Sequence, residues 1–260
     1  MDTNEKFELL KSSIKEMGKV VIAFSGGVDS TFLLKVAHDV LGTNVVAVTA
    51  RSSTYPEREF KEAFNFARQL GVKHIVITSE ELDTEGFSDN LPNRCYLCKR
   101  GLFRKIRQVA NLYDINCIAD GSNFDDLGDY RPGMQAADEL GVVSPLQDAG
   151  LTKDDLRTLS SEMGLSTWDK PAFACLSSRF PYGEKITREK LKMVETAEQV
   201  LLDFGFCLVR VRHHGDVARI EVSPSERKKF LDDQLLDRID EAFKKIGFTY
   251  TAQGDIGREV

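Results

Sequence analysis

The sequence predicts an α/β fold in which a doubly wound parallel sheet is followed by a smaller α+β domain. Short apolar runs alternate with segments whose apolar residues recur at helical spacing, which is typical of strands joined by helical crossovers. The first run ends in a glycine turn that leads directly into a helix, and from Asp169 onward the alternation stops. We expect an N-terminal domain over residues 1–168, an interdomain loop over 169–183, and a small substrate-binding or oligomerisation domain over 184–260.

The first element is an apolar run at 20–24, which predicts a strand buried on both faces. Ser-Gly-Gly at 25–27 breaks the run, and helical spacing begins at Asp29. This junction predicts an anion site, because the first N–H groups of a helix have no partner within it and the helix dipole is positive at that end. The two glycines let the backbone approach a phosphate closely, and Ser25 and Ser30 add hydroxyl donors. A Walker loop is excluded, because GxxxxGK[ST] is absent.

The later elements follow from local patterns. One helix should end at Gly71, and another should begin after Thr152, where Asp155 completes a capping box. Ligands bind beyond the carboxyl ends of the strands in such sheets, so Arg51, which follows a strand, either contacts the ligand or lies in a surface loop.

Further strands are expected at 45–50, 74–78 and 117–119. The second domain should contain a helix at 187–204, a hairpin of 208–212 and 218–222 that turns at 213–216, one long helix at 224–246 and a strand at 248–252.

The composition of the chain limits the classes of protein to which it can belong. The 260 residues are 42% hydrophobic and 29% charged, which is ordinary for a globular protein. The net charge of −6 argues against generic binding to nucleic acid. Residues 1–17 form a charged amphipathic segment rather than a secretory signal, and no apolar run is long enough to span a bilayer. We therefore expect a cytoplasmic protein, in which a cysteine pair is more often metal-binding or catalytic than disulfide-bonded.

Three cysteines form the candidate metal site. Cys95 and Cys98 make a C-x-x-C, and Cys175 lies in the predicted interdomain loop. Three thiolates suit a 4Fe-4S cluster with one open iron, although the C-x-x-C could also be a redox dithiol or two free thiols at the start of a helix. Cys117, within an apolar strand, is interpreted as a buried inert thiol. Basic residues near these thiols would favour thiolates, namely Arg94, Lys99, Arg100 and Arg179.

Other polar residues are less specific. The loop at 124–132 contains acids such as Asp126, whose oxygens suit Mg²⁺ but are equally typical of a solvated loop. Arg210 and Arg212 share one face of a predicted strand and could grip a phosphate or a carboxylate, although a solvent-facing strand looks the same. The histidines at 213–214 are placed in the hairpin turn.

SGGVDS resembles the PP-loop signature of the ATP pyrophosphatases, which cleave ATP between its α and β phosphates. The wider set of motifs is similar to the LarE family, the ATP-dependent sulfur transferases that make the nickel-pincer nucleotide cofactor. This resemblance spans nearly the whole chain and implies an adenine nucleotide alpha hydrolase-like fold for the first domain. The motifs are SGGVDS at 25–30, DGSN at 120–123, DYRPG at 129–133, ACLSSRFPYG at 174–183 and VRVR at 209–212.

The resemblance implies an enzyme that uses ATP and Mg²⁺ to adenylate the carboxylates of pyridinium-3,5-biscarboxylic acid mononucleotide, releases pyrophosphate and forms thiocarboxylates. One branch of the family sacrifices the sulfur of a single cysteine in the loop corresponding to 174–178. The other holds a 4Fe-4S cluster with three cysteines, and Cys95 and Cys98 beside Cys175 resemble that branch. The family also implies a homo-oligomer, whereas the sulfur donor stays unknown.

The resemblance assigns roles to individual residues. ATP would be bound by Ser25, Gly26, Gly27, Asp29, Ser30, Arg51 and Gly121. The substrate phosphate would be bound by Ser178, Arg179, Arg210 and Arg212. Cys95, Cys98 and Cys175 would act as cluster ligands and in catalysis, Lys99 would lie near the reacting carboxylate, and Asp29 and Asp126 would hold Mg²⁺.

Three alternatives remain open from the sequence. A tRNA-thiolating PP-loop enzyme also uses ATP and three cysteines, and its RNA footprint would be the basic cluster between residues 94 and 107. An amidating synthetase would use ammonia and would not need the C-x-x-C. A nucleotide-sensing or iron–sulfur storage module would bind ATP without releasing pyrophosphate.

Overall fold

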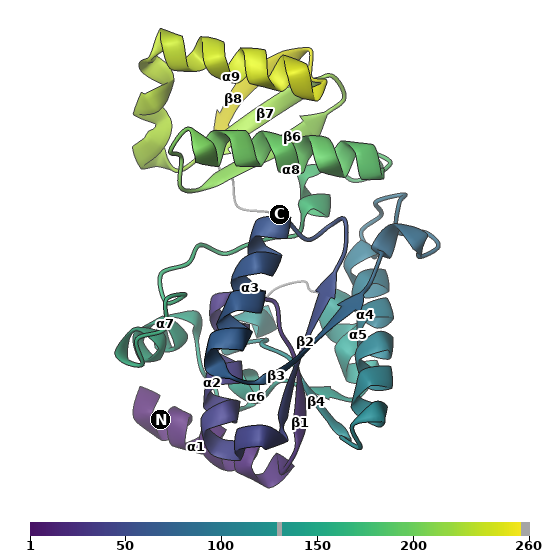
Figure 1. The fold of residues 1–260 in the computed structure, drawn as a ribbon, viewed down its shortest axis with the longest axis vertical. Helices are drawn as coiled ribbons and strands as arrows, with labels where there is room; N and C mark the ends of the chain where they lie inside the picture. The colour runs from purple at the N-terminus through teal and green to yellow at the C-terminus, as the bar shows by residue number, and fades with distance from the viewer. Residues whose placement is uncertain (129–131, 256–260) are drawn as a thin grey trace. The chain divides into compact units, whose positions relative to one another are not determined.

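The computed structural model describes residues 1–128 and 132–255, with the side chain of residue 255 left out, and the chain forms two compact units (Figure 1). The first unit comprises Met1–Thr84 and Asn93–Phe173, and the second comprises Glu85–Pro92 and Ala174–Val260. Residues 129–131 of the DYRPG motif lie outside the described residues. The predicted division at 168 and 183 remains a prediction.

The first unit contains a five-stranded sheet in the order β3-β2-β1-β4-β5, in which every pairing is parallel. This topology, with the smaller sheet of the second unit, confirms the predicted fold class. The short strand β5 was not predicted, because two residues carry no periodicity. The strands are β1 at Val20–Ala23, β2 at Val45–Arg51, β3 at Lys73–Thr78, β4 at Cys117–Ala119 and β5 at Val142–Val143.

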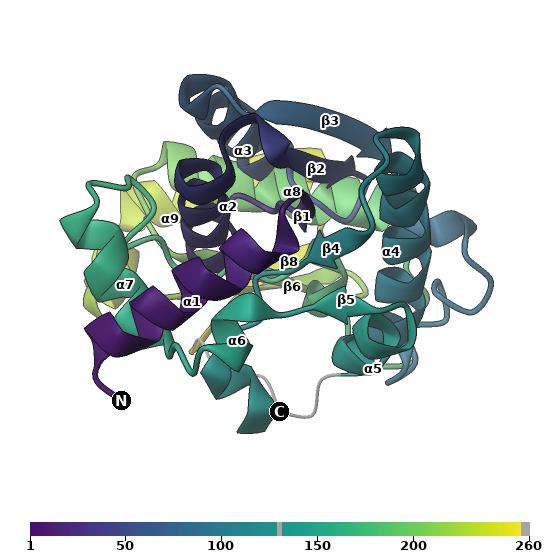
Figure 2. The ribbon, with the colours of Figure 1, turned by 90° about the horizontal axis from the view of Figure 1, so that it is seen from below.

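Helices cover both faces of this sheet (Figure 2). Val20 and Ile22 pack into the core that α1, α2 and α3 share, whereas Val21 packs into a second core with residues of α4 and α5. Alternate residues of β1 thus fill both cores, as its apolar run predicted. The helices are α1 at Thr3–Met17, α2 at Val28–Leu41, α3 at Glu57–Leu70, α4 at Arg94–Leu112, α5 at Pro132–Glu139, α6 at Pro145–Asp148 and α7 at Lys153–Glu162.

Two predicted helix ends are confirmed. Gly71 closes α3 in the left-handed conformation, with φ of 73°. Thr152 and Asp155 form the capping box of α7, because each side chain accepts a hydrogen bond from the other residue's backbone N–H. No helix within the described residues is both long enough and apolar enough to cross a membrane.

The second unit contains a three-stranded sheet in the order β6-β7-β8. Strands β6 and β7 pair antiparallel as the predicted hairpin, and β8 adds parallel to β7. A core cluster joins this sheet to α8 and α9. The elements are α8 at Arg188–Asp203, β6 at Val209–His214, β7 at Val217–Val222, α9 at Asp233–Ile246 and β8 at Tyr250–Asp255.

Two predictions for this unit are wrong. The single helix expected at 224–246 is a 3-10 helix at Pro224–Leu231 followed by α9, because the Asp232 side chain accepts hydrogen bonds from two backbone N–H groups and caps a new helix. The histidines at 213–214 belong to β6, and the turn is made by Gly215, whose φ of 62° few other residues tolerate, and Asp216.

Candidate active site

A cavity of about 400 Å³ opens in the first unit where the carboxyl ends of β1, β2 and β4 meet. Its volume falls within the usual range for small-molecule sites. The wall facing the strand ends comes from α4, through Lys99, Leu102 and Ile106. Of the residues predicted to bind ATP, the cavity is lined by Ser25, Gly27, Asp29, Ser30 and Gly121. The cavity thus lies where the strand order reverses, between β1 and β4, which is the usual position of a ligand site in such sheets.

The segment 25–30 connects β1 to α2 and forms one wall of the cavity; we call it the 25–30 loop. Gly26 has φ of 67°, and an added Cβ would lie 2.8 Å from Ala63 Cβ, so only glycine fits. The hydroxyls of Ser25 and Ser30 lie 3.1 Å apart and close the loop on itself. Gly121 approaches the loop from β4, where an added Cβ would lie 2.9 Å from the Ser30 nitrogen. These close backbone contacts explain why glycines occupy both positions.

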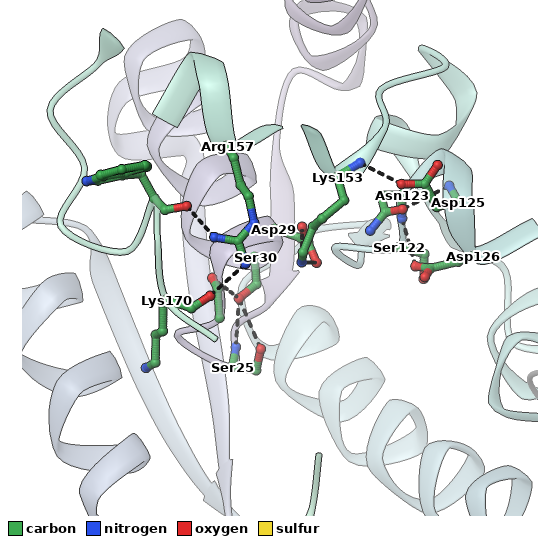
Figure 3. Close-up of polar contacts among 12 residues, drawn as sticks. Ser25, Asp29, Ser30, Ser122, Asn123, Asp125, Asp126, Lys153, Arg157 and Lys170 are labelled. Carbon is green, nitrogen blue, oxygen red and sulfur yellow. Dashed lines mark hydrogen bonds and ion pairs between the residues drawn. The ribbon is translucent and has the colours of Figure 1, made fainter. Parts of the chain in front are cut away.

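Asp29 is held by a lysine that was not predicted. Lys153 Nζ lies 2.8 Å from one carboxylate oxygen of Asp29 and 2.6 Å from the other (Figure 3). The backbone N–H of Lys153 also donates to Asp125 Oδ2 at 2.8 Å. The sequence did contain a signal for this pair. A lysine directly after the capping Thr152 places a cation at the positive end of a helix dipole, which is unfavourable unless an anionic side chain lies nearby.

Asp126 lines the same cavity, is buried and accepts a hydrogen bond of 2.9 Å from the Asn123 backbone N–H. Nearby, Asp120 accepts hydrogen bonds from the Ser122 and Ser144 hydroxyls. Over residues 1–128 and 132–254, no group of three or more His, Cys, Asp or Glu side chains converges on a metal position. Magnesium binding by Asp29 and Asp126 therefore stays a prediction, although carboxylate oxygens next to a phosphate loop are suitable donors.

The cavity also contains two residues beyond β2 that were not predicted, Tyr55 and Glu81. Glu81 lines it, and burial raises the pKa of this carboxyl against the lowering effect of hydrogen bonds that include one from Thr54. Tyr55 contacts Phe173 edge-on and donates to the Ser25 carbonyl at 2.7 Å, and its pKa is raised chiefly by burial. A buried carboxyl and two aromatic rings make this part suited to hold the polar and apolar edges of a planar group.

Arg51 was predicted to bind ATP but does not line the cavity. Its guanidinium lies 2.9 Å from Glu57 and stacks over the Phe60 ring at the exposed start of α3. The structure places Arg51 at the exposed end of strand β2, and the nucleotide contact stays a prediction.

The C-x-x-C lies at the start of α4. Cys95 is exposed, Cys98 is half-buried, and neither forms a disulfide. Their spacing places them about one turn apart at the N-terminus of this helix. Lys99 follows and lines the cavity, with its ammonium 5.2 Å from the Phe103 ring centroid. The structure thus places the two thiols and Lys99 on the same helix, and their role as cluster ligands stays a prediction.

The remaining predicted residues belong to the second unit. Cys175 is half-buried and precedes the short 3-10 helix Leu176–Arg179. Arg179 is only 2% exposed, and its Nε donates to Glu198 at 2.7 Å. Its Nη1 donates to the Ser178 hydroxyl at 2.7 Å. Arg179 is thus built into the protein interior rather than presented at a surface.

Arg210 and Arg212 are both half-buried on the same face of β6, between buried valines, as the alternation predicted. The Nε of Arg212 donates to both oxygens of Glu221, and its Nη1 donates to the Ser178 carbonyl at 2.7 Å. The second unit therefore brings Ser178, Arg179 and Arg212 together. Their binding of a substrate phosphate remains a prediction.

Comparisons with known proteins show which sequences this chain is similar to. A protein family described as NAD synthase matches residues 3–116. The pyridinium-3,5-bisthiocarboxylic acid mononucleotide synthase of Lactiplantibacillus plantarum is 38% identical over 93% of this chain and 87% of its own. A protein of Synechocystis sp. described only as uncharacterized is 44% identical over 94% of this chain and 91% of its own. The tRNA-specific 2-thiouridylase MnmA of Rickettsia felis is 27% identical over 58% of this chain and 52% of its own.

Proposed function

The chain belongs to the LarE family of PP-loop proteins, the family of the bisthiocarboxylic acid mononucleotide synthase, and we propose that it is an ATP-dependent sulfur transferase acting on pyridinium-3,5-biscarboxylic acid mononucleotide. The observation that carries this proposal is one cavity that contains both the 25–30 loop and Lys99. The loop offers N–H groups to phosphates, and Lys99 offers a cation to a carboxylate.

The reaction begins with activation of a carboxylate, which is a poor electrophile. A carboxylate oxygen of the substrate attacks the α-phosphorus of ATP, the bond from that phosphorus to the β-phosphate oxygen breaks, and pyrophosphate leaves. The 25–30 loop would hold the phosphates, and Lys99 would hold the attacking carboxylate close to them. A sulfide then attacks the carbonyl carbon and AMP departs, which leaves a thiocarboxylate. A second round converts the other carboxylate.

The sulfur source divides the proposal into two forms. Cys95 and Cys98 suit two ligands of a 4Fe-4S cluster, with Cys175 as the third, and such a cluster would supply a reactive sulfide on its open iron. Alternatively, Cys175 would give up its own sulfur. The presence of the C-x-x-C favours the first form, because a sacrificial mechanism needs only Cys175.

Two alternative functions have less support. For tRNA thiolation, the basic residues of α4 would have to meet RNA, yet Arg107 donates to the carbonyls of Asn116 and Leu140 and Lys105 donates to the Thr78 carbonyl. An amidating synthetase would give the cysteines no role. Both alternatives share the PP-loop and so predict the same adenylation half-reaction on a different acceptor.

The test incubates anaerobically reconstituted protein with Mg-ATP and the biscarboxylic acid mononucleotide. We expect pyrophosphate release that depends on the mononucleotide, and a product in which sulfur replaces oxygen by mass spectrometry. Lys99→Met should abolish release, whereas Lys105→Met, on the same helix, should retain it. Release that requires tRNA or ammonia, and ignores the mononucleotide, would refute the proposal.

A further inference from the structure

The first three carbonyl groups of the 25–30 loop each accept a hydrogen bond. The Tyr55 hydroxyl donates to the Ser25 carbonyl at 2.7 Å, and Lys170 Nζ donates to the Gly26 carbonyl at 3.3 Å. The Gly27 carbonyl accepts from the backbone N–H of residue 31, within α2, at 3.0 Å. A trans peptide places its C=O and N–H on opposite sides, so each fixed carbonyl also fixes the direction of the N–H that follows it.

The Ser25 N–H of the loop donates to the Ser30 hydroxyl at 3.3 Å, but two other N–H groups of the loop are available to a ligand. Within the described parts of the chain, the backbone N–H groups of Gly26 and Gly27 have no hydrogen-bond partner. Gly27 lines the cavity of about 400 Å³ in which we propose that ATP binds, and we call it the nucleotide cavity. Gly26 and Lys170 line a separate cavity of about 450 Å³. Lys170 therefore reaches the loop from outside the nucleotide cavity, and the peptide it holds can direct its N–H towards that cavity.

Lys170 is itself held firmly. Its Nζ lies 2.7 Å from Glu59 and 2.6 Å from Glu62, both on α3, and its side chain is 15% exposed. Burial would lower the pKa of Lys170, but the two carboxylates outweigh burial and raise the pKa, so the ammonium stays charged. Arg157 donates to the carbonyls of Trp168 and Lys170 at 2.7 and 2.8 Å and fixes the backbone of this segment (Figure 3).

We propose that Lys170 is a positioning residue for the phosphates of ATP: it holds the Gly26 carbonyl so that the Gly27 N–H faces the nucleotide. Lys170 itself does not touch the nucleotide. The proposal rests on the proposed use of ATP and extends it, because it ties the phosphate site to the chain segment that leads to Cys175. Tyr55 holds the preceding peptide through the Ser25 carbonyl.

The test measures binding by calorimetry, without any carboxylate substrate, for adenosine and for an ATP analogue with an uncleavable α–β linkage. We expect Lys170→Met to raise the Kd of the analogue about tenfold and to change the Kd of adenosine by less than about twofold. Lys170→Arg should recover most of the affinity. Lys61→Met removes an exposed lysine of α3 as a matched control and should alter neither Kd. Equal weakening of both ligands, or no weakening, would overturn the proposal.

A double variant separates positioning from simple charge balance. If Lys170 only neutralised Glu59, the double variant Lys170→Met with Glu59→Gln would regain affinity for the analogue, and this result would also overturn the proposal. A wild-type protein that binds no ATP analogue would refute the proposed function itself, whereas a binding wild type with an unaffected Lys170→Met variant would refute this inference alone.

Discussion

The Lys153 ammonium lies 2.6–2.8 Å from both carboxylate oxygens of Asp29, although 124 residues separate the two in sequence. Asp29 is in the first turn of α2, at the wall of the nucleotide cavity, and Lys153 begins α7. The pair thus joins two helix N-termini beside the proposed phosphate site. It offsets a negative charge that would otherwise repel a phosphate at close range.

Replacing Lys153 should therefore impair the use of ATP. We expect Lys153→Met to lower kcat/KM for pyrophosphate release by about 10- to 100-fold, because an uncompensated carboxylate would remain at the cavity wall. Steady-state kinetics with varied ATP would measure this loss. Lys35→Met, which breaks the exposed pair with Asp39 on the same α2, should leave kcat/KM within about twofold. Equal effects of the two variants would contradict the role assigned to the pair.

The proposed cluster can be tested by its iron. After anaerobic reconstitution, the wild-type protein should hold about four irons and show broad thiolate-to-iron absorption. Cys98→Ala should lose both, because a three-cysteine site cannot survive the loss of a ligand. Cys207→Ala, which removes an exposed thiol outside the predicted set, should retain both.

A wild-type protein that stays colourless would exclude the cluster form of the mechanism. Cys175 would then be the sulfur source, and mass spectrometry should detect the loss of one sulfur atom from the protein after turnover. If product forms although the protein contains no iron and loses no sulfur, both the cluster mechanism and the sacrificial mechanism would be wrong. The sulfur would then have to come from another donor.

The pair of Arg179 and Glu198 should contribute mainly to stability. Glu198 is fully buried and accepts from Arg179 and from the Val211 backbone N–H at 3.1 Å. Glu198→Ala should lower the free energy of unfolding by about 3–5 kcal/mol, because it leaves a guanidinium buried without its counter-charge. Urea unfolding would measure the difference, and Lys192→Ala on the exposed side of α8 should change the free energy by less than about 0.5 kcal/mol.

Arg179 was also predicted to bind a substrate phosphate, and the two roles can be distinguished. If phosphate binding dominates, Arg179→Met should raise KM for the mononucleotide and leave the urea midpoint unchanged. Because the side chain is buried, we expect instead that Arg179→Met chiefly lowers the urea midpoint, with a large loss of stability.

Local sequence patterns predicted most of the fold, because strand β1, the 25–30 loop and the capping box at Thr152 each depend on neighbouring residues. Contacts between distant residues were not predictable in this way. The pairing of Lys153 with Asp29 is one example. Another is the segment Glu85–Pro92, which joins the second unit and whose Asn90 side chain donates to the carbonyls of Phe180 and Pro181. Periodicity reports which face of an element is buried but not which element covers it.

The same limit applies to His213, whose buried position in β6 predicts a pH dependence of stability. Its ring lies between Phe180 and Phe248, and its Nδ1 lies 2.9 Å from Glu184. Burial lowers the pKa of His213, and Lys190 adds to this effect, while Glu184 opposes it without cancelling it. The folded state therefore binds fewer protons at this site than the unfolded state, where histidine has a pKa of about 6.5.

The contribution of His213 to the free energy of unfolding should therefore be complete above a pH of about 6.5. It should decline as the pH falls from there towards the lower pKa that His213 has in the folded state. The urea midpoint of the wild type, followed by circular dichroism, should decrease from pH of about 7.5 to about 5.5 more steeply than that of His213→Phe, in which nothing titrates at this position. If the urea midpoints of wild type and His213→Phe changed in parallel with pH, folding would not alter the proton affinity of the His213 ring. Only a difference between the folded and unfolded pKa makes stability depend on pH.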